Sequence, residues 1–198
     1  MEDTFKTIAQ NSEALHKEKM SRFIAFAFPV RSVEEVKSHV ERLQKEYYDA
    51  RHVCYAYMLG HERKEFRAND NGEPSGTAGK PILGQINSFE LTDILIVVVR
   101  YFGGIKLGTG GLTVAYKEAA RLVIHENEII EKTVDDEFVI QFEYPMMNDV
   151  MRIVKEENPE VISQQFDVAC EMKLRIRRSA AEKLNSRLSK VESLRFQK

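Results

Sequence analysis

Glycine is concentrated in one part of the chain. Of the ten glycines, nine lie between Gly72 and Gly111, in two clusters that flank the apolar run 94–99. Glycine is favoured where the backbone needs a positive φ or where another group must approach it closely. The β-branched run between the clusters is typical of a strand buried on both faces. This pattern predicts an α/β arrangement in which glycine loops form a site at the end of a buried strand.

Size and composition restrict the class of protein. The chain has 198 residues, 43% hydrophobic and 30% charged, as in soluble globular proteins. The net charge of −2 does not indicate nucleic-acid binding by the chain as a whole. No apolar run is long enough for a membrane helix, and the first residues do not resemble a secretory signal. Two distant cysteines are not a disulfide framework, so a reducing cytoplasm is the expected compartment.

Local patterns place further elements around the glycine clusters. Ser32 is followed three residues later by Glu35, a capping-box pattern that predicts the start of a helix. Alternation of apolar and polar residues predicts strands, and apolar residues at helical spacing predict helices. The other expected elements are a short helix at 4–11, strands at 13–29, 52–59 and 64–68, and helices that begin near residues 77 and 112.

The chain changes character after the second glycine cluster. Residues 131–136 form a charged stretch typical of a linker, and no glycine follows Gly111. The remaining pattern predicts the order β-α-β-β-α-β, which is ferredoxin-like, with Ser179 and Glu182 as a capping box for the second helix. We therefore expect an α+β protein with two domains, residues 1–131 and 132–198.

Polar and basic side chains gather at both glycine clusters. Free amides at a glycine loop and a helix N-terminus bind anions, and nearby lysine or arginine adds charge. The pattern therefore predicts a phosphate, nucleotide or RNA-backbone site; alternatively, the glycines only permit tight turns and close packing. The candidates are Arg67, Asp70, Glu73, Thr77 and Lys80 in the first cluster, and Arg100, Tyr101, Gly103, Gly104, Lys106, Gly108, Thr109, Gly110, Gly111 and Lys117 in the second.

Neither glycine cluster is a standard nucleotide motif. Pro81 stands where a Walker A loop needs Ser or Thr, and the second cluster lacks the third spaced glycine of the dinucleotide fingerprint. We expect no cofactor, and the histidines and cysteines show no metal-ligand spacing. His52 and Cys54 face the same way on a strand, which fits a thiol nucleophile with a base but is more typical of a buried structural cysteine.

A basic stripe is expected in the second domain. Lys173, Arg175 and Arg177 alternate with apolar residues, so one face of their strand is basic. Such a face can follow a phosphate backbone and extend the binding surface. The alternative is a solvated sheet face that acids elsewhere balance.

Two segments resemble the signature blocks of the IMPACT/YigZ family: residues 70–83 (DNGEPSGTAGKPIL) and 98–112 (VVRYFGGIKLGTGGL). Residues 21–25 and 52–57 resemble flanking blocks. The resemblance implies an N-terminal α/β sandwich similar to the second domain of a small-subunit ribosomal protein. It also implies a C-terminal domain similar to the last domain of elongation factor G. Val114 stands where the family usually has Arg, so one positive charge is missing after the second cluster.

The family resemblance also implies a role in translation. Eukaryotic members restrain a stress kinase of translation initiation, and nucleic-acid or ribosome binding is inferred for bacterial members by analogy of fold. The leading hypothesis is a non-catalytic regulator that binds RNA or the ribosome, with no DNA sequence specificity and no membrane partner. One alternative is an enzyme for a small anionic or peptide substrate, with Asp70 or Glu73 as acid or base. The other is a regulator that binds a translation-related protein and no nucleic acid.

Overall fold

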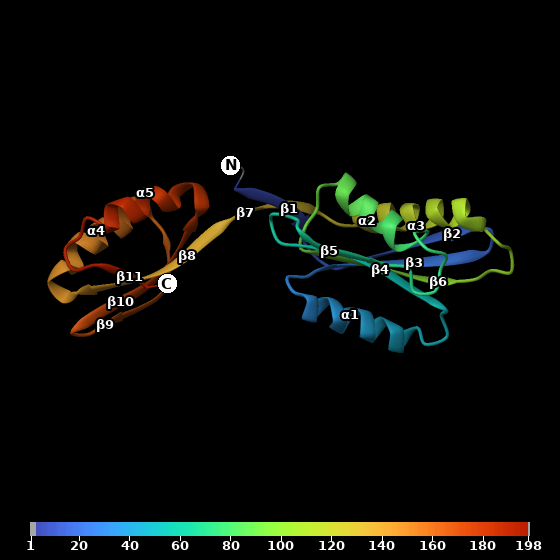
Figure 1. Cartoon of the computed structure of the whole chain (residues 1–198), viewed down its shortest axis with the longest axis horizontal. Coiled ribbons are helices and arrows are strands. Elements are labelled where there is room, and N and C mark those ends of the chain that lie inside the picture. Colours follow the sequence, from blue (N-terminus) through green and yellow to red (C-terminus); the bar gives the residue numbers. More distant parts are fainter. Residues whose placement is uncertain (1–2, 198) are drawn as a thin grey trace. The chain divides into compact units, whose positions relative to one another are not determined.

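The computed structural model describes residues 3–197 (Figure 1). These residues form eleven strands, five α-helices and one short 3-10 helix. Their contacts divide the chain into two compact units. The first is Phe5–Lys132, and the second joins the residues through Thr4 to the segment from Thr133 onward. Each unit has its own hydrophobic core, so the chain is an α+β protein with two sheet-based parts.

An antiparallel five-stranded sheet forms the centre of the N-terminal unit. Its elements are β2 (Ser12–Glu18), β3 (Ser21–Pro29), α1 (Val33–Glu46), β4 (His52–Leu59), β5 (Glu65–Asn69), α2 (Gly79–Ser88), β6 (Ile94–Tyr101) and α3 (Gly108–His125). The strand order is β2-β3-β6-β4-β5, and every neighbouring pair is antiparallel. Helix α1 covers one face, and α2 and α3 cover the other (Figure 1).

Strand β6 is buried on both faces, as its sequence predicts. The even-numbered residues of 94–98 pack with α2 and α3, whereas the odd-numbered residues of 95–99 pack with α1. Because side chains alternate between the faces of a strand, a sheet covered on both sides needs an uninterrupted apolar run at its centre. The run therefore fixes β6 as the central strand, and both glycine clusters lie at its C-terminal end, where Glu73 pairs with Arg100 and Gly103 follows the strand.

Helix α1 begins as the sequence predicts. The Ser32 hydroxyl accepts a hydrogen bond from the Glu35 amide at 3.2 Å, and the Glu35 carboxylate accepts one from the Arg31 amide at 2.9 Å. Val36 and Leu43 on its inner face are buried. Burying each such side chain contributes about 1.5–3 kcal/mol, so packing adds to the local cap.

Two predictions for the first thirty residues are wrong. Residues 4–11 do not form a helix: strand β1 (Thr4–Ile8) lies there and pairs with β7 (Ile129–Thr133). Residues 13–29 do not form one strand, because Lys19 and Met20 adopt φ values of 43° and 69° and turn the chain into the β2–β3 hairpin. Neither turn residue is glycine, so composition does not mark this turn.

The second unit is a four-stranded sheet with two helices on one face. Its elements are β8 (Asp135–Glu143), the 3-10 helix η1 (Tyr144–Met146), α4 (Met147–Glu157), β9 (Glu160–Phe166), β10 (Ala169–Arg177), α5 (Arg178–Leu188) and β11 (Arg195–Gln197). The strand order is β11-β8-β10-β9. Apolar side chains of β8 and β10 pack with α4 and α5 to form its core.

Two local predictions in this part of the chain need correction. Residues 131–136 contain the division between the two units, as expected, but they are not an irregular linker, because all but Val134 lie in β7 or β8. Ser179 is not the N-cap of α5, which begins at Arg178. Instead, the Asp3 carboxylate accepts a hydrogen bond from the Ser179 amide at 3.2 Å. The carboxylate that caps this helix is remote in sequence, so a local pattern does not reveal it.

Candidate functional site

A buried polar network lies where β6 and α3 meet the first glycine cluster. Glu73 is 8% exposed and Arg100 is 7% exposed. Arg100 Nη1 and the Tyr116 hydroxyl both donate hydrogen bonds to Glu73 Oε1, each at 2.7 Å. Burial raises the pKa of Tyr116, so its hydroxyl remains a donor. Arg100 is committed to an internal carboxylate, which corrects the prediction that it contacts a ligand phosphate.

Cys54 joins this network as a thiol. Its Sγ donates to the Asp70 carbonyl oxygen at 2.8 Å, and burial raises the pKa of the thiol to about 12. On the same strand, His52 Nδ1 lies 2.9 Å from the Asn71 carbonyl oxygen, and His52 Nε2 lies 3.9 Å from Glu73 Oε2. Because the thiolate is the nucleophilic form, the geometry favours a structural role for Cys54.

Asp70 supplies the anion for the first glycine cluster. Its Oδ2 accepts a hydrogen bond from the Gly76 amide at 2.9 Å, and its Oδ1 accepts from Ala78 and Gly79 at 3.1 and 2.9 Å. Burial alone raises the pKa of Asp70, but these three N–H donors outweigh it and hold the pKa below its ordinary value. The carboxylate caps α2, where it also opposes the helix dipole. The amides are therefore not free for a ligand, contrary to the prediction for this cluster.

Close packing requires glycine at two positions. A Cβ on Gly103 would lie 2.0 Å from the Met20 carbonyl carbon, and one on Gly79 would lie 2.4 Å from the Asn69 nitrogen. The Gly103 amide also donates to the Ser21 hydroxyl at 3.2 Å. At these two positions the structure confirms the packing interpretation of the glycines.

The second loop, residues 102–107, leads into a helix whose N-terminus is open. Within residues 3–197, no side chain accepts a hydrogen bond from the amides of Gly108, Thr109 or Gly110 in the first turn of α3. A Cβ added at Gly108 or Gly110 would meet nothing within 4 Å. Lys106, directly before the helix, is exposed. An uncapped helix N-terminus beside a cation attracts anions.

Residues 19–124, which include both glycine clusters, match the Impact N-terminal domain family. The chain belongs to the IMPACT family. IMPACT family member YigZ of Escherichia coli K12 is 36% identical over 150 residues, which cover 75% of this chain and 74% of YigZ. An IMPACT family member of Haemophilus influenzae is 34% identical over 185 residues, which cover 90% of this chain and 87% of that protein. A solved structure described as a hypothetical protein matches with a TM-score of 0.76 and 29% identity, covering 99% and 97% of the two chains.

The other candidate residues of this IMPACT chain either hydrogen-bond to acceptors within the protein or are exposed. The Tyr101 hydroxyl donates to Asp49 at 2.7 Å, and burial raises the pKa of Tyr101 to about 12. The Thr77 hydroxyl donates to the Pro74 carbonyl at 2.6 Å. The exposed candidates are Arg67 on β5, Lys80 on α2, Gly104 in the second loop, and Gly108, Thr109, Gly110 and Lys117 on α3, with Gly111 half-buried beside them.

Carboxylates neutralise the basic stripe of β10. The ion pairs are Lys173–Glu137 (2.9 Å), Arg175–Glu137 (2.6 Å), Arg175–Glu160 (3.1 Å) and Arg177–Asp3 (2.6 Å). The acids lie on β8 and β9, the two strands that neighbour β10, and both Glu137 and Glu160 are in register with Arg175. This arrangement favours the solvated, balanced face over a free phosphate-binding patch.

Two features of the site have no clear signal in the sequence. Tyr116 belongs to the apolar stripe of α3, and the pattern does not reveal that its hydroxyl reaches Glu73. The exposed side chains of Phe102 and Ile105 lie in the loop beside Met20, and only the fold shows that they are exposed. Both features depend on contacts between distant segments.

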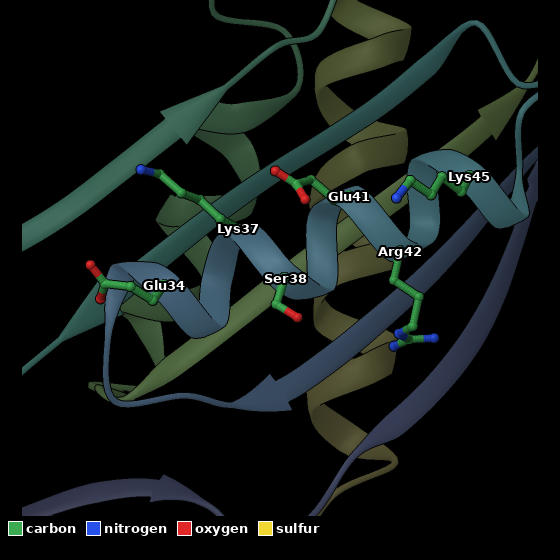
Figure 2. Close-up of a pocket in the computed structure, with 6 residues that line it drawn as sticks. All are labelled: Glu34, Lys37, Ser38, Glu41, Arg42 and Lys45. Carbon is green, nitrogen blue, oxygen red and sulfur yellow. The ribbon is translucent and has the colours of Figure 1, made fainter.

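A shallow hollow runs along α1 (Figure 2). It is lined by Glu34, Lys37, Ser38, Glu41, Arg42 and Lys45. Acids and bases are interspersed along this exposed face, which is typical of a solvated helix surface. We assign it no ligand.

Within the described part of the chain, no group of three or more His, Cys, Asp or Glu side chains is placed to hold a metal ion. None of the helices in residues 3–197 is both long enough and apolar enough to cross a membrane.

Proposed function

We propose that this chain is a non-catalytic, translation-associated protein that binds RNA or the ribosome through its second loop and the start of α3. The observation that carries the proposal is the contrast between two helix N-termini. Asp70 fills the anion position in front of α2, whereas within residues 3–197 no side chain accepts from the first amides of α3, beside Lys106. A phosphate from a ligand would accept hydrogen bonds from the first amides of α3, as the Asp70 carboxylate does from those of α2.

Exposed cations support this surface. Within residues 3–197, Lys106 and Lys117 form no ion pair or side-chain hydrogen bond, so they can meet a phosphate without breaking an internal contact. Gly110, Val114 and Lys117 follow helical spacing and are all exposed, so they form one face of α3. Because Val114 is neutral, we expect Lys106 and Lys117 to carry much of the charge attraction.

The alternative of an enzyme fits the geometry less well. Glu73 Oε1 already accepts two hydrogen bonds, and Asp70 accepts three from backbone amides. Neither carboxylate is placed to exchange a proton with a substrate, because a catalytic acid or base must reach the reacting group.

Fold analogy also supports a role in translation. We propose that the N-terminal unit is similar to the second domain of a small-subunit ribosomal protein. We propose that the second unit is a ferredoxin-like module similar to the last domain of elongation factor G, in keeping with its strand order β11-β8-β10-β9. Such analogies guide the choice of assay, while the site itself must carry the function.

Sedimentation with ribosomal fractions tests the proposal. We expect the full chain to sediment with these fractions at about 50 mM salt and to be largely released at about 200 mM, because phosphate contacts weaken as salt rises. Absence from the fractions at both concentrations would contradict the proposal. Retention independent of salt would contradict it as well and would favour a protein partner.

A further inference from the structure

An exposed apolar patch lies beside the second loop. Met20 is 76% exposed, Phe102 is 53% exposed and Ile105 is 50% exposed. Adjacent exposed apolar side chains commonly mark an interaction surface. The hydrogen bonds of the buried Glu73 network leave these three side chains exposed, so the patch needs a separate explanation.

Packing holds the two turns of the patch together. Gly103 follows Phe102 and approaches the Met20 backbone so closely that a Cβ would lie 2.0 Å from the Met20 carbonyl carbon. The Gly103 amide donates to the Ser21 hydroxyl at 3.2 Å. The β2–β3 turn and the second loop are therefore neighbours at one end of the sheet, and Met20 and Phe102 belong to one surface.

The buried network positions the Phe102 ring. The guanidinium carbon of Arg100 lies 5.8 Å from the centre of this ring and 5.7 Å from the centre of the Phe23 ring. Glu73 holds the same guanidinium at 2.7 Å. A cation at this distance attracts an aromatic ring, so Phe102 is held in place while about half of its surface remains exposed. A planar group can stack on a ring presented in this way.

Cations flank the patch on both turns. Lys106 follows it in the second loop and Lys19 precedes Met20, and both lysines are exposed. An exposed ring with exposed lysines on the same two turns matches a nucleobase with its neighbouring phosphates. In a duplex the bases are paired and stacked on one another, so this surface favours an unpaired strand.

We propose that the ligand at this surface is single-stranded RNA, with one base stacked on Phe102 and phosphates at Lys19 and Lys106. This inference rests on the proposed function and specifies its ligand. The ring supplies affinity that does not depend on salt, whereas the cations supply the part that does. The two contributions can therefore be separated experimentally.

Fluorescence anisotropy with labelled RNA tests the inference on the full chain. The probes are a strand of about twelve nucleotides and the duplex that it forms with its complement, since single-strand sites span about 4–16 nucleotides. We expect the single strand to bind more tightly than the duplex. Phe102→Ala should weaken single-strand binding about 10-fold and leave its salt dependence unchanged, because no charge is lost. Phe102→Tyr should retain binding.

Phe66→Ala is the matched control, because Phe66 on β5 is 56% exposed and lies outside the patch. It should bind RNA as the unmodified chain does. Phe102→Leu, which keeps an apolar side chain without a ring, gives the same comparison if Phe102→Ala does not fold.

Each other outcome overturns the inference in a recognisable way. Equal RNA affinity of Phe102→Ala and the unmodified chain would contradict base stacking on Phe102 but would leave the proposed function standing. No binding of either probe by the unmodified chain would overturn the inference, and the sedimentation with ribosomal fractions would then decide the proposed function separately. Phe102-dependent binding of polyglutamate in place of RNA would assign the patch to an acidic protein partner.

Discussion

At the scale of single residues, Asp70 organises the first glycine cluster. One carboxylate accepts hydrogen bonds from three backbone amides and caps α2. Its backbone carbonyl also accepts from the Cys54 thiol. The turn and the start of α2 therefore depend on the negative charge of one side chain more than on the glycines around it.

Asp70→Asn should lower the free energy of unfolding by about 1–3 kcal/mol, because charge-assisted hydrogen bonds are lost and an amide group faces backbone donors. Urea denaturation followed by circular dichroism measures the loss. Glu41→Gln removes one carboxylate from the exposed face of α1 and should change stability by less than about 0.5 kcal/mol. Equal stability of both variants would show that the Asp70 cap contributes little.

The same carboxylate predicts a dependence on pH. The pKa of Asp70 in the folded chain lies below the ordinary value of 3.8, so the unfolded state binds more protons between the two values. The stabilisation is therefore complete above the ordinary pKa and is lost as pH falls through the folded pKa. We expect the stability difference between the unmodified chain and Asp70→Asn to shrink below about pH 4. A difference that stays constant from about pH 6 to pH 3 would contradict this origin.

Gly103 and Gly84 should respond oppositely to alanine. Gly103→Ala places a Cβ against the Met20 backbone and should cost about 1–3 kcal/mol of stability. Gly84 lies in α2, where a Cβ would meet nothing within 4 Å, so Gly84→Ala should stabilise by about 0.5–1 kcal/mol. Thermal unfolding of the two variants measures both effects. Stabilisation by Gly103→Ala would mean that the two turns are not in close contact.

At the scale of elements, the sequence predicts best what local patterns determine. The apolar run of β6, the Ser32 cap of α1 and the β9–β10 hairpin follow from spacing within a few residues. Strand β1 and the start of α5 do not, because one depends on pairing with β7 and the other on Asp3. The candidate site follows the same rule: glycine clusters locate both loops, but only the fold shows that Asp70 fills one of them.

The basic stripe of β10 provides a test at the scale of an element. Because Glu137 and Glu160 pair with its cations, Lys173→Gln/Arg175→Gln should leave RNA affinity nearly unchanged. These exposed pairs also contribute little to stability, about 0–1 kcal/mol each. Anisotropy titration with the same single strand makes the measurement. A large loss of affinity would show that the basic stripe of the second unit contributes to RNA binding.

At the scale of the whole molecule, charge has to act locally. The net charge is −2, so the chain as a whole does not attract RNA. The proposed binding therefore depends on a few cations near the second loop. Removing two of them should have a larger effect than removing two cations elsewhere on the surface.

The most direct test is the slope of log affinity against log salt concentration for single-stranded RNA. Lys106→Gln/Lys117→Gln should make the slope shallower by about 1.4, since each lost phosphate contact on a single strand contributes about 0.7. Lys37→Gln/Lys45→Gln removes the same charge from the exposed face of α1 and should leave the slope unchanged. Equal slopes for the two double variants would contradict binding at the second loop.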